Sequence, residues 1–352
     1  MYHFCTYFDQ HYLARGLALY DSLQKHVEQF RLYVLCFDNE TYAFLSKLNE
    51  PGLIPISLDK FEEGDIALLL AKRNRSQIEY YFTCTPSLAL YVLDNFPAID
   101  IVTYIDADLF FFANPAPIYD ELGEQSILII GHRFPEQRKY QEKLVGVYNV
   151  GYLSFRNDLS GRKCLTWWRE RCIEWCYDRL EDGKFGDQKY LDDWSTRFER
   201  VVVLQQKGAG IAPWNVSNYD IQVCRGLVQI DSDSLIFYHF HNLKIINLFM
   251  FDLGTDHWAA KQAKIIREEL YAPYLHNLQT LLPKTLLSTW IDVRSKSFQT
   301  QWQKLRKALI YGRIIILFKS IAIEIYLYPL FCQLLKSKNV TVRNLKAKLT
   351  LN

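Results

Sequence analysis

The chain has 352 residues, of which 49% are hydrophobic and 23% charged, and its formal net charge is +2 at pH 7. This length suits one large domain with an appendage, or two domains, and the composition is that of an ordinary globular protein. The eight cysteines form no Cys-x-x-Cys pair and show no zinc-ligand spacing, which argues against a zinc site. Nothing at the N-terminus resembles a secretory signal, so we expect a cytoplasmic protein.

The first part of the chain alternates between short apolar strands and amphipathic helices. The pattern predicts strands over 2–7, 30–37 and 54–58 and helices over 12–23 and 40–48. Such alternation is typical of βαβ units, which build a mainly parallel sheet with helices on both faces. Ligands bind beyond the carboxyl ends of the strands in such sheets. The chain has no glycine-rich phosphate loop, so a bound phosphate would need another form of recognition.

The stretch 101–115 combines an apolar strand with two carboxylates, Asp106 and Asp108. In extended backbone, side chains at i and i+2 point to the same side with Cα atoms roughly 6.5 Å apart, so both carboxylates are able to face one cation. Mg²⁺ and Mn²⁺ bind one or two carboxylates and complete their coordination with water and phosphate oxygens. The alternative is a pair of carboxylates that caps a turn.

The elements after this pair continue the α/β pattern. It predicts helices over 88–95 and 162–180 and strands over 127–130, 147–155, 201–204 and 236–241. Asn149 and Gly151 lie inside one of these strands, where Asn is disfavoured and Gly often marks the close approach of a ligand. A structural bulge is the alternative.

Two further positions carry polar side chains at element boundaries. Asp187 follows a glycine at a predicted helix start and suits an N-cap, although capping gives no reason for Gln188 beside it. His239 and His241 fall on one face of the strand 236–241. Two such imidazoles are able to complete a metal site, and the alternative is buried histidines with satisfied hydrogen bonds.

Together these motifs resemble the retaining family 8 glycosyltransferases of the GT-A fold, which include glycogenin and the bacterial lipopolysaccharide galactosyltransferases. The motifs follow the family's order over residues 2–245, as Thr6-Tyr7, Asp106-Ala107-Asp108, Asn149-Val150-Gly151, Gly186-Asp187-Gln188, Pro213-Trp214-Asn215 and His239-Phe240-His241. The segment Tyr81 to Ser87 also looks like one found in uncharacterised bacterial glycosyltransferases. The resemblance implies an α/β GT-A catalytic domain over 1–245, with a Rossmann-like, mostly parallel central sheet.

The resemblance also implies roles for individual residues. The ligands of Mn²⁺ or Mg²⁺ would be Asp106, Asp108, His239 and His241. His239 matches the family's third ligand best. The nucleotide would be held by Thr6, Tyr7, Tyr12, Asp106 and Lys244. Lys244 is an imperfect counterpart of the family's diphosphate-binding lysine, because it lies one residue too close to the histidine. The catalytic candidates around the donor sugar would be Asp187, Gln188 and Asn149, and the substrate contacts would be Trp214, Asn215 and Gly151.

The implied activity is metal-dependent transfer of a sugar from a nucleotide-diphosphate donor, with a UDP-sugar favoured and with retention of configuration. The acceptor would be a glycan, a lipid-linked sugar or a lipopolysaccharide. A divalent cation suits this chemistry because charge develops on the leaving diphosphate. Two alternatives are a non-catalytic scaffold that binds sugar nucleotides and an aspartate-dependent phosphohydrolase. The phosphohydrolase is disfavoured because it expects Thr or Val where this chain has Phe110.

The C-terminal part is predicted to be a helical extension, with a connector over 246–300 and a basic, apolar tail over 301–352. Residues 302–352 contain ten Lys or Arg residues and one acidic residue. The longest uncharged run in the tail, 325–335, has 11 residues, which is too short to span a bilayer. We expect the tail to lie on an anionic membrane surface, peripherally at the inner face. The alternative is packing on the catalytic domain or on a second copy in a homo-oligomer. No nucleic-acid partner is expected.

Overall fold

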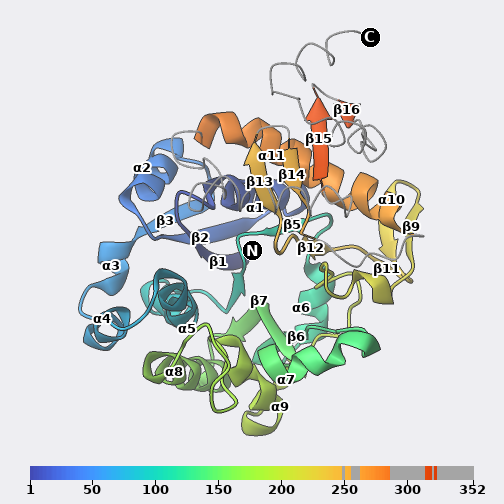
Figure 1. Cartoon of the computed structure of the whole chain (residues 1–352). Helices are drawn as coiled ribbons and strands as arrows, with labels where there is room; N and C mark the ends of the chain where they lie inside the picture. The colour runs from blue at the N-terminus through green and yellow to red at the C-terminus, as the bar shows by residue number, and fades with distance from the viewer. Residues whose placement is uncertain (248–249, 255–261, 286–313, 319–320, 323–352) are drawn as a thin grey trace, which may run out of the picture. The chain divides into compact units, whose positions relative to one another are not determined.

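The computed structural model describes residues 1–247, 250–254, 262–285, 314–318 and 321–322 (Figure 1). The chain divides into two compact units, of which the first comprises Met1–His241 with His257–Trp290 and the second Asn242–Asp256 with Ile291–Asn352. Each unit is described by itself below.

A seven-stranded sheet forms the centre of the first unit, in the order β3-β2-β1-β4-β7-β6-β8. Its strands are β1 (Tyr2–Phe8), β2 (Phe30–Cys36), β3 (Leu53–Ser57), β4 (Ile101–Ile105), β6 (Ile127–Gly131), β7 (Tyr148–Arg156) and β8 (Val201–Val203). Neighbouring strands are parallel except at β7, which runs antiparallel to β4 and β6. The predicted α/β fold with a mostly parallel sheet is confirmed. The start of β7 therefore lies at the same edge as the carboxyl ends of β4 and β6.

Helices connect these strands in the expected βαβ manner. The α-helices up to β8 are α1 (Leu13–His26), α2 (Asn39–Leu48), α3 (Leu58–Glu62), α4 (Ile66–Lys72), α5 (Gln77–Asn95), α6 (Ala116–Leu122), α7 (Glu142–Val145), α8 (Leu159–Glu174) and α9 (Trp194–Arg197). The prediction for α5 was too short, because Ser76 and Glu79 form a capping box that starts the helix earlier. The predicted helix 162–180 was too long, since the backbone becomes extended at Trp175.

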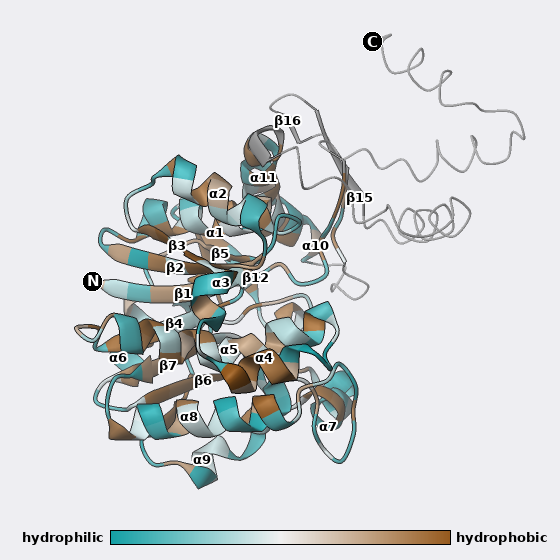
Figure 2. Ribbon diagram, turned by 90° about the vertical axis from the view of Figure 1, so that its left-hand side faces the viewer, coloured by the Kyte–Doolittle hydropathy of each residue, from teal (hydrophilic) through white to brown (hydrophobic). Residues whose placement is uncertain are grey.

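The apolar core contains a large cluster in which α5 and α8 pack together against β4 and β7 (Figure 1). Figure 2 shows β6 and β7 largely in the brown of hydrophobic residues. The rings of Trp168 and Trp194 are fully buried and meet edge to face, with centroids 5.3 Å apart. Full burial of a large apolar side chain stabilises the fold by roughly 1.5–3 kcal/mol. The indole N–H of Trp168 donates to the backbone oxygen of Asp187 at 2.9 Å, so the core also fixes this segment.

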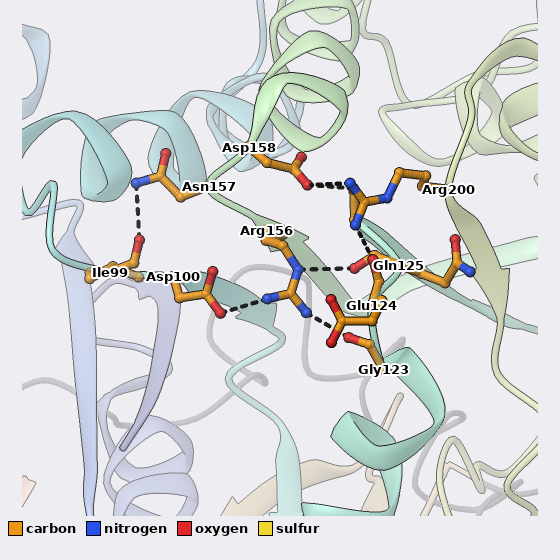
Figure 3. A network of polar contacts seen from close by, with 10 residues as sticks. Ile99, Asp100, Gly123, Glu124, Gln125, Arg156, Asn157, Asp158 and Arg200 are labelled. Carbon is orange, nitrogen blue, oxygen red and sulfur yellow. Dashed lines mark hydrogen bonds and ion pairs between the residues drawn. The ribbon is translucent and has the colours of Figure 1, made fainter.

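Arg156 organises the end of the sheet that is remote from Asp106 and Asp108 (Figure 3). Its guanidinium group donates to one carboxylate and two backbone oxygens, which are Asp100 Oδ2 at 2.6 Å, Gly123 O at 2.6 Å and Gln125 O at 3.2 Å. Beside it, Asp158 caps α8 through Gly161 N and forms an ion pair with Arg200. These contacts tie β4, α6, β7 and α8 together away from the candidate site.

The last helices of the first unit are α10 (Ala263–Ile265), the π-helix η4 (Ile266–Tyr271) and α11 (Ala272–Thr285), which packs against α1. Asn277 of α11 donates to the carboxylate of Asp21 in α1 at 3.0 Å. A small antiparallel ribbon joins β5 (Leu109–Phe111) to β12 (Phe237–His239). A three-stranded antiparallel sheet contains β9 (Ile221–Cys224), β10 (Leu227–Ile230) and β11 (Asp233–Ser234).

The second unit contains an antiparallel sheet of β13 (Lys244–Asn247), β14 (Met250–Asp252), β15 (Ile314–Phe318) and β16 (Ile321–Ala322). The prediction of a helical tail is wrong for the described residues of β15 and β16, where a run of β-branched isoleucines favours strand. The other residues of the predicted tail lie outside the described part of the chain. Among the described residues, no helix is long and apolar enough to cross a membrane.

Candidate metal and donor site

The ribbon of β5 and β12 brings His239 next to the Asp pair. Its register places His239 opposite Leu109, and the backbone N–H of Phe240 donates to Asp108 O at 2.9 Å. The Nε2 atom of His239 lies 3.0 Å from Asp108 Oδ1 and 3.6 Å from Asp106 Oδ2. The fold therefore brings His239 together with Asp106 and Asp108, which lie far from it in the sequence.

His241 extends this cluster to a third ligand group. The ligand atoms of Asp108, His239 and His241 all lie within 4.8 Å of one another. His239 is buried and His241 is exposed, so one imidazole lies beneath the site and the other at its rim. One carboxylate and two imidazoles suit a first-row transition-metal cation such as Mn²⁺ better than Mg²⁺, which binds almost entirely through oxygen ligands. These residues fit the cation that the sequence implied.

The charges of these groups depend on one another. Burial alone raises the pKa of Asp108, but the charge and hydrogen bond of His239 outweigh burial and hold that pKa at about 2. Burial opposes protonation of His239, whereas the two aspartates raise its pKa overall. Burial also raises the pKa of Asp106, which accepts a hydrogen bond from the Tyr104 hydroxyl at 2.8 Å. The site thus keeps Asp108 ionised, as a cation ligand requires.

Gly151 of β7 permits the close approach of these side chains. A Cβ atom added there would lie 2.6 Å from Asn149 Oδ1, 3.0 Å from Asp106 Oδ2 and 3.0 Å from His239 Cε1. The backbone oxygen of Gly151 accepts from Asp106 N at 3.0 Å. The sequence signal of a glycine within a strand therefore had a steric cause, which is room for three polar side chains.

Asn149 and Gln188 are bound to each other at the same edge of the sheet. Asn149 Nδ2 donates to Gln188 Oε1 at 3.1 Å, and Gln188 Nε2 donates to Val145 O at 2.8 Å. His132, which had no assigned role in the sequence, lies 3.4 Å from Asn149 Nδ2 through Nε2 and 3.0 Å from Gly146 O through Nδ1. A neutral ring that donates from Nδ1 and accepts at Nε2 satisfies both contacts. The sequence signal that could have identified His132 is its position directly after β6, at the edge of the sheet where ligands bind.

Asp187 occupies the N-cap position of the 3₁₀ helix η2 (Gln188–Asp193), but its side chain makes no capping hydrogen bond. The alternative in which Asp187 acts as a helix cap is therefore wrong, and its catalytic role stays a prediction. The carboxyl group is buried, and burial raises its pKa to about 7, with Asp106 acting in the same direction and the Thr85 hydroxyl opposing it. A buried carboxyl that is close to Asp106 and uninvolved in capping is a candidate functional group.

The loop before η3 (Val216–Asn218) contributes Trp214 but not Asn215. The Trp214 ring meets His239 and His241 edge to face at 5.2 and 5.4 Å, and its N–H donates to His132 O. A small pocket is lined by Trp214, His239, Asn149 and Gly151, among others. Asn215 is fully buried and bonds only backbone groups of the protein, so it shapes the loop instead of facing a substrate.

The residues expected to hold a nucleoside lie at the end of β1 and the start of α1. Tyr12 is 41% exposed, which leaves ring surface for stacking. Tyr7 contacts Thr85 through its hydroxyl at 3.2 Å, and the buried Thr6 hydroxyl has no hydrogen-bond partner among the described residues. Lys244, the remaining candidate, belongs to β13 in the second unit.

Comparison with known proteins places the chain among bacterial relatives. No family model matches it. The uncharacterised protein YfnF of Bacillus subtilis (strain 168) is 35% identical over 294 residues, which cover 80% of this chain and 95% of YfnF. The uncharacterised protein YfnD of the same organism is 30% identical over 300 residues, covering 84% of this chain and 92% of YfnD.

Among solved structures, the galactosyltransferase LgtC, crystallised with donor and acceptor sugar analogues, is similar with a TM-score of 0.51. The sequence identity is 14%, and the match covers 85% of this chain and 99% of LgtC. At this identity the likeness concerns the fold, and it confirms the GT-A architecture predicted from the order of motifs. The chain belongs to the protein family of YfnF and YfnD and has the GT-A fold of LgtC.

Proposed function

We propose that this protein is a metal-dependent glycosyltransferase that moves a sugar from a nucleoside diphosphate donor to an acceptor hydroxyl group. The observation that carries the proposal is the convergence of Asp106, Asp108, His239 and His241 at the edge of the sheet, beside the buried Asp187. A turn cap, the alternative role of the Asp pair, needs no histidine 3.0 Å from Asp108.

The donor is proposed to be a UDP-sugar bound with Mn²⁺. Asp106, Asp108, His239 and His241 hold the cation, which when bound supplies charge stabilisation for the leaving diphosphate. Two imidazoles in the set favour Mn²⁺ over Mg²⁺. The exposed ring of Tyr12 offers a stacking surface for the base. Thr6 and Tyr7 complete the nucleoside pocket, and Lys244 contacts the diphosphate.

The sugar is proposed to lie between Asn149, Gln188 and Asp187, with Gly151 and Trp214 at its border. Asp187 in its ionised form stabilises the positive charge that develops at the anomeric carbon. Gln188 Oε1 accepts from Asn149 Nδ2 and from Val150 N, so the amide is oriented before a donor binds. We propose retention of configuration. The anomeric configuration of the product, determined by NMR and compared with that of the donor, tests it directly.

The acceptor is proposed to be a glycan, a lipid-linked sugar or a lipopolysaccharide. The excess of Lys and Arg over residues 302–352 supports contact with an anionic membrane surface. Flotation of the full chain with anionic vesicles, compared with a chain that ends near Thr300, tests this contact. Equal recovery of both proteins in the unbound fraction would contradict it.

The activity is tested with UDP-, GDP- and CMP-sugars, each with and without Mn²⁺. Nucleotide release and thermal stabilisation by one donor in the presence of Mn²⁺ are expected, and Asp108→Asn should abolish the release. Binding without release in the wild type would favour the non-catalytic scaffold. Phosphate release from simple phosphate esters would favour the phosphohydrolase. Absence of any metal-dependent stabilisation would contradict the proposed function.

A further inference from the structure

The segment between β6 and β7 presents a face to solvent that mixes lysine and large apolar side chains. It includes the 3₁₀ helix η1 (Glu136–Gln141), which continues directly into α7 (Figure 1), and the two residues before β7. The exposed side chains of this face, called the 139–147 strip below, are Lys139, Tyr140, Lys143, Leu144 and Val147. The two lysines are four residues apart, as are the tyrosine and the leucine, which places each pair on one side of a helical turn.

The apolar members of this strip are well exposed. Tyr140 is 61% exposed, Leu144 43% and Val147 38%. Single apolar side chains on a surface are common, whereas several that lie together mark an interaction site. The lysines add positive charge, and the side chain of Lys139 is 59% exposed and lies 3.9 Å from the carboxylate of Glu136. An exposed ion pair at this distance contributes little, so the strip keeps a basic character.

The strip is held next to the residues that are proposed to surround the donor sugar. Gln188 Nε2 donates to Val145 O at 2.8 Å, and the backbone N–H of Val147 donates to Asp192 Oδ1 at 2.7 Å. Both partners belong to η2. Gly146 has a φ of +106°, and a Cβ atom there would lie 3.0 Å from Asp192 Oδ1, so the chain turns closely around η2 at this point. The strip therefore has a fixed place beside the proposed sugar site.

The combination of charge and apolar surface argues against a second copy of this chain as the partner. A two-fold contact sets the same patch of both copies against each other. Lys139 and Lys143 would then approach the lysines of the other strip, and like charges brought together in an interface disfavour association. The strip is therefore expected to bind an anionic partner.

An anionic membrane surface matches both properties of the strip. Lysine side chains reach lipid phosphates with their charged ends while their stems lie along apolar groups. Leucine, valine and tyrosine side chains insert at the boundary between headgroups and acyl chains, where tyrosine is favoured. The strip covers residues 139–147 alone, so it is able to lie on a membrane but is too short to cross one.

We propose that the 139–147 strip of the first unit binds an anionic membrane surface. The strip is distinct from residues 302–352, whose membrane contact is proposed above, because those residues belong to the second unit. Its place beside Gln188 presents the sugar site to an acceptor at the lipid surface, a consequence that rests on the proposed function. The acceptor class that follows is a lipid-linked sugar.

The first test locates the contact in the full wild-type chain. The protein is bound to vesicles of phosphatidylcholine mixed with a photoreactive phosphatidylserine, irradiated, and digested, and peptide mass mapping finds the lipid adducts. Adducts within 136–147 are expected. Adducts confined to other parts of the chain, including 302–352, would overturn the inference.

The second test measures vesicle binding of full-length variants by co-sedimentation. Lys143→Gln combined with Leu144→Gln should weaken binding to vesicles that contain phosphatidylserine about tenfold, because one lysine near an anionic surface contributes about five-fold and the leucine adds apolar contact. Binding to pure phosphatidylcholine should change less. Lys47→Gln combined with Leu48→Gln, which alters an equally exposed Lys-Leu pair on α2, is the matched control and should bind as the wild type does.

Equal binding of the strip variant and the wild type would overturn the inference, as would a strip variant that loses self-association in solution instead of vesicle binding. If the strip variant unfolds in a thermal melt, the adducts on the wild type still decide. Binding of UDP with Mn²⁺ in the absence of vesicles should be the same in the wild type and the strip variant. Wild-type protein that forms adducts within 136–147 but binds no nucleotide with Mn²⁺ would contradict the proposed function and leave the membrane contact standing.

Discussion

His239 places its Nε2 atom 3.0 Å from Asp108 Oδ1, although the two residues lie in separate halves of the first unit's sequence. The contact is fixed by the pairing of β12 with β5, so it exists before any ligand binds. His241, by contrast, is exposed at the rim of the same cluster. His239 is therefore the stronger candidate for a ligand of the cation, and His241 the weaker one.

This inequality predicts different effects of His239→Gln and His241→Gln on Mn²⁺ binding. His239→Gln should weaken Mn²⁺ binding on the order of 100-fold, because it removes a buried ligand that Asp108 already orients. His241→Gln should cost about tenfold or less, because water can replace an exposed imidazole. Calorimetric titration of Mn²⁺ checks both variants, with the exposed His276→Gln as control. A larger loss in His241→Gln would reverse the assignment.

Gly151→Ala should damage the site through one methyl group. The added Cβ atom would press on Asn149 Oδ1, Asp106 Oδ2 and His239 Cε1. We expect a loss of about 1–3 kcal/mol in stability and a fall in Mn²⁺ affinity, because overpacking forces the neighbours apart. Gly131→Ala in β6 is the control for stability, since its Cβ atom would meet its nearest neighbour at 3.6 Å. Equal stability of both variants would show that β7 adjusts freely.

The order of strands and helices could be predicted from the sequence because the relevant signals are local. Apolar periodicity gave the βαβ units, and Asp106 and Asp108 stood out because carboxylates interrupt an apolar run. These features do not depend on which distant segments meet. For Gly151 the close approach of a ligand stays a prediction, whereas the structure shows a steric need for glycine and an irregularity in the pairing of β6 with β7 at this point, as the bulge alternative expected.

The errors concern residues whose role depends on contacts between distant segments. Asn215 resembled a substrate contact, but its amide bonds to the backbone oxygens of His132 and Gly210. For Asp187 the sequence left helix capping open as an alternative, and only the folded chain shows that the carboxyl group caps nothing.

Arg156→Met should reduce stability without affecting the metal site. The change leaves the backbone oxygens of Gly123 and Gln125 without their guanidinium donor (Figure 3). A loss of about 1 kcal/mol is expected, because Gly123 and Gln125 are exposed and water can replace the lost donor. Urea denaturation measures it, with the exposed Arg73→Met as control. Mn²⁺ affinity should stay at the wild-type value, because Arg156 lies at the other end of β7; a parallel loss of affinity would contradict this separation.

The stability of the protein should fall between pH 6.5 and pH 4 in part because of His132. Burial lowers the pKa of His132 from 6.5 to about 4, with its hydrogen bonds to backbone groups opposing the shift. The unfolded chain therefore takes up a proton near pH 6.5 while the folded protein does not. The stability is complete above pH 6.5 and falls as the pH decreases toward 4, by about 3 kcal/mol at most.

Urea denaturation of wild type and His132→Gln at pH 7.5, 6 and 5 checks this contribution. The variant should be less stable at pH 7.5, because the contacts with Asn149 and Gly146 change, and its stability should fall less steeply with decreasing pH. His276→Gln, which removes an exposed imidazole, serves as the matched control. Parallel curves for wild type and His132→Gln would assign the acid sensitivity to other groups.

Asp187→Asn should separate binding from turnover. The carboxyl group is buried close to Asp106 but is not among the clustered ligand atoms of Asp108, His239 and His241. Its loss should leave Mn²⁺ and UDP affinity within a few-fold of wild type, because the amide keeps the shape of the side chain. The turnover number should fall by about 100- to 1,000-fold, as when a preorganised stabilising group is removed from a transition state.

Because burial raises the pKa of Asp187 to about 7, wild-type kcat/KM should rise with pH until that value is passed. Assays of nucleotide release across pH 5.5–8.5 measure both the rate and its pH dependence. Asp178→Asn, which changes an exposed carboxylate, is the control. If Asp187→Asn kept both the rate and the pH profile of the wild type, Asp187 would have no role in turnover.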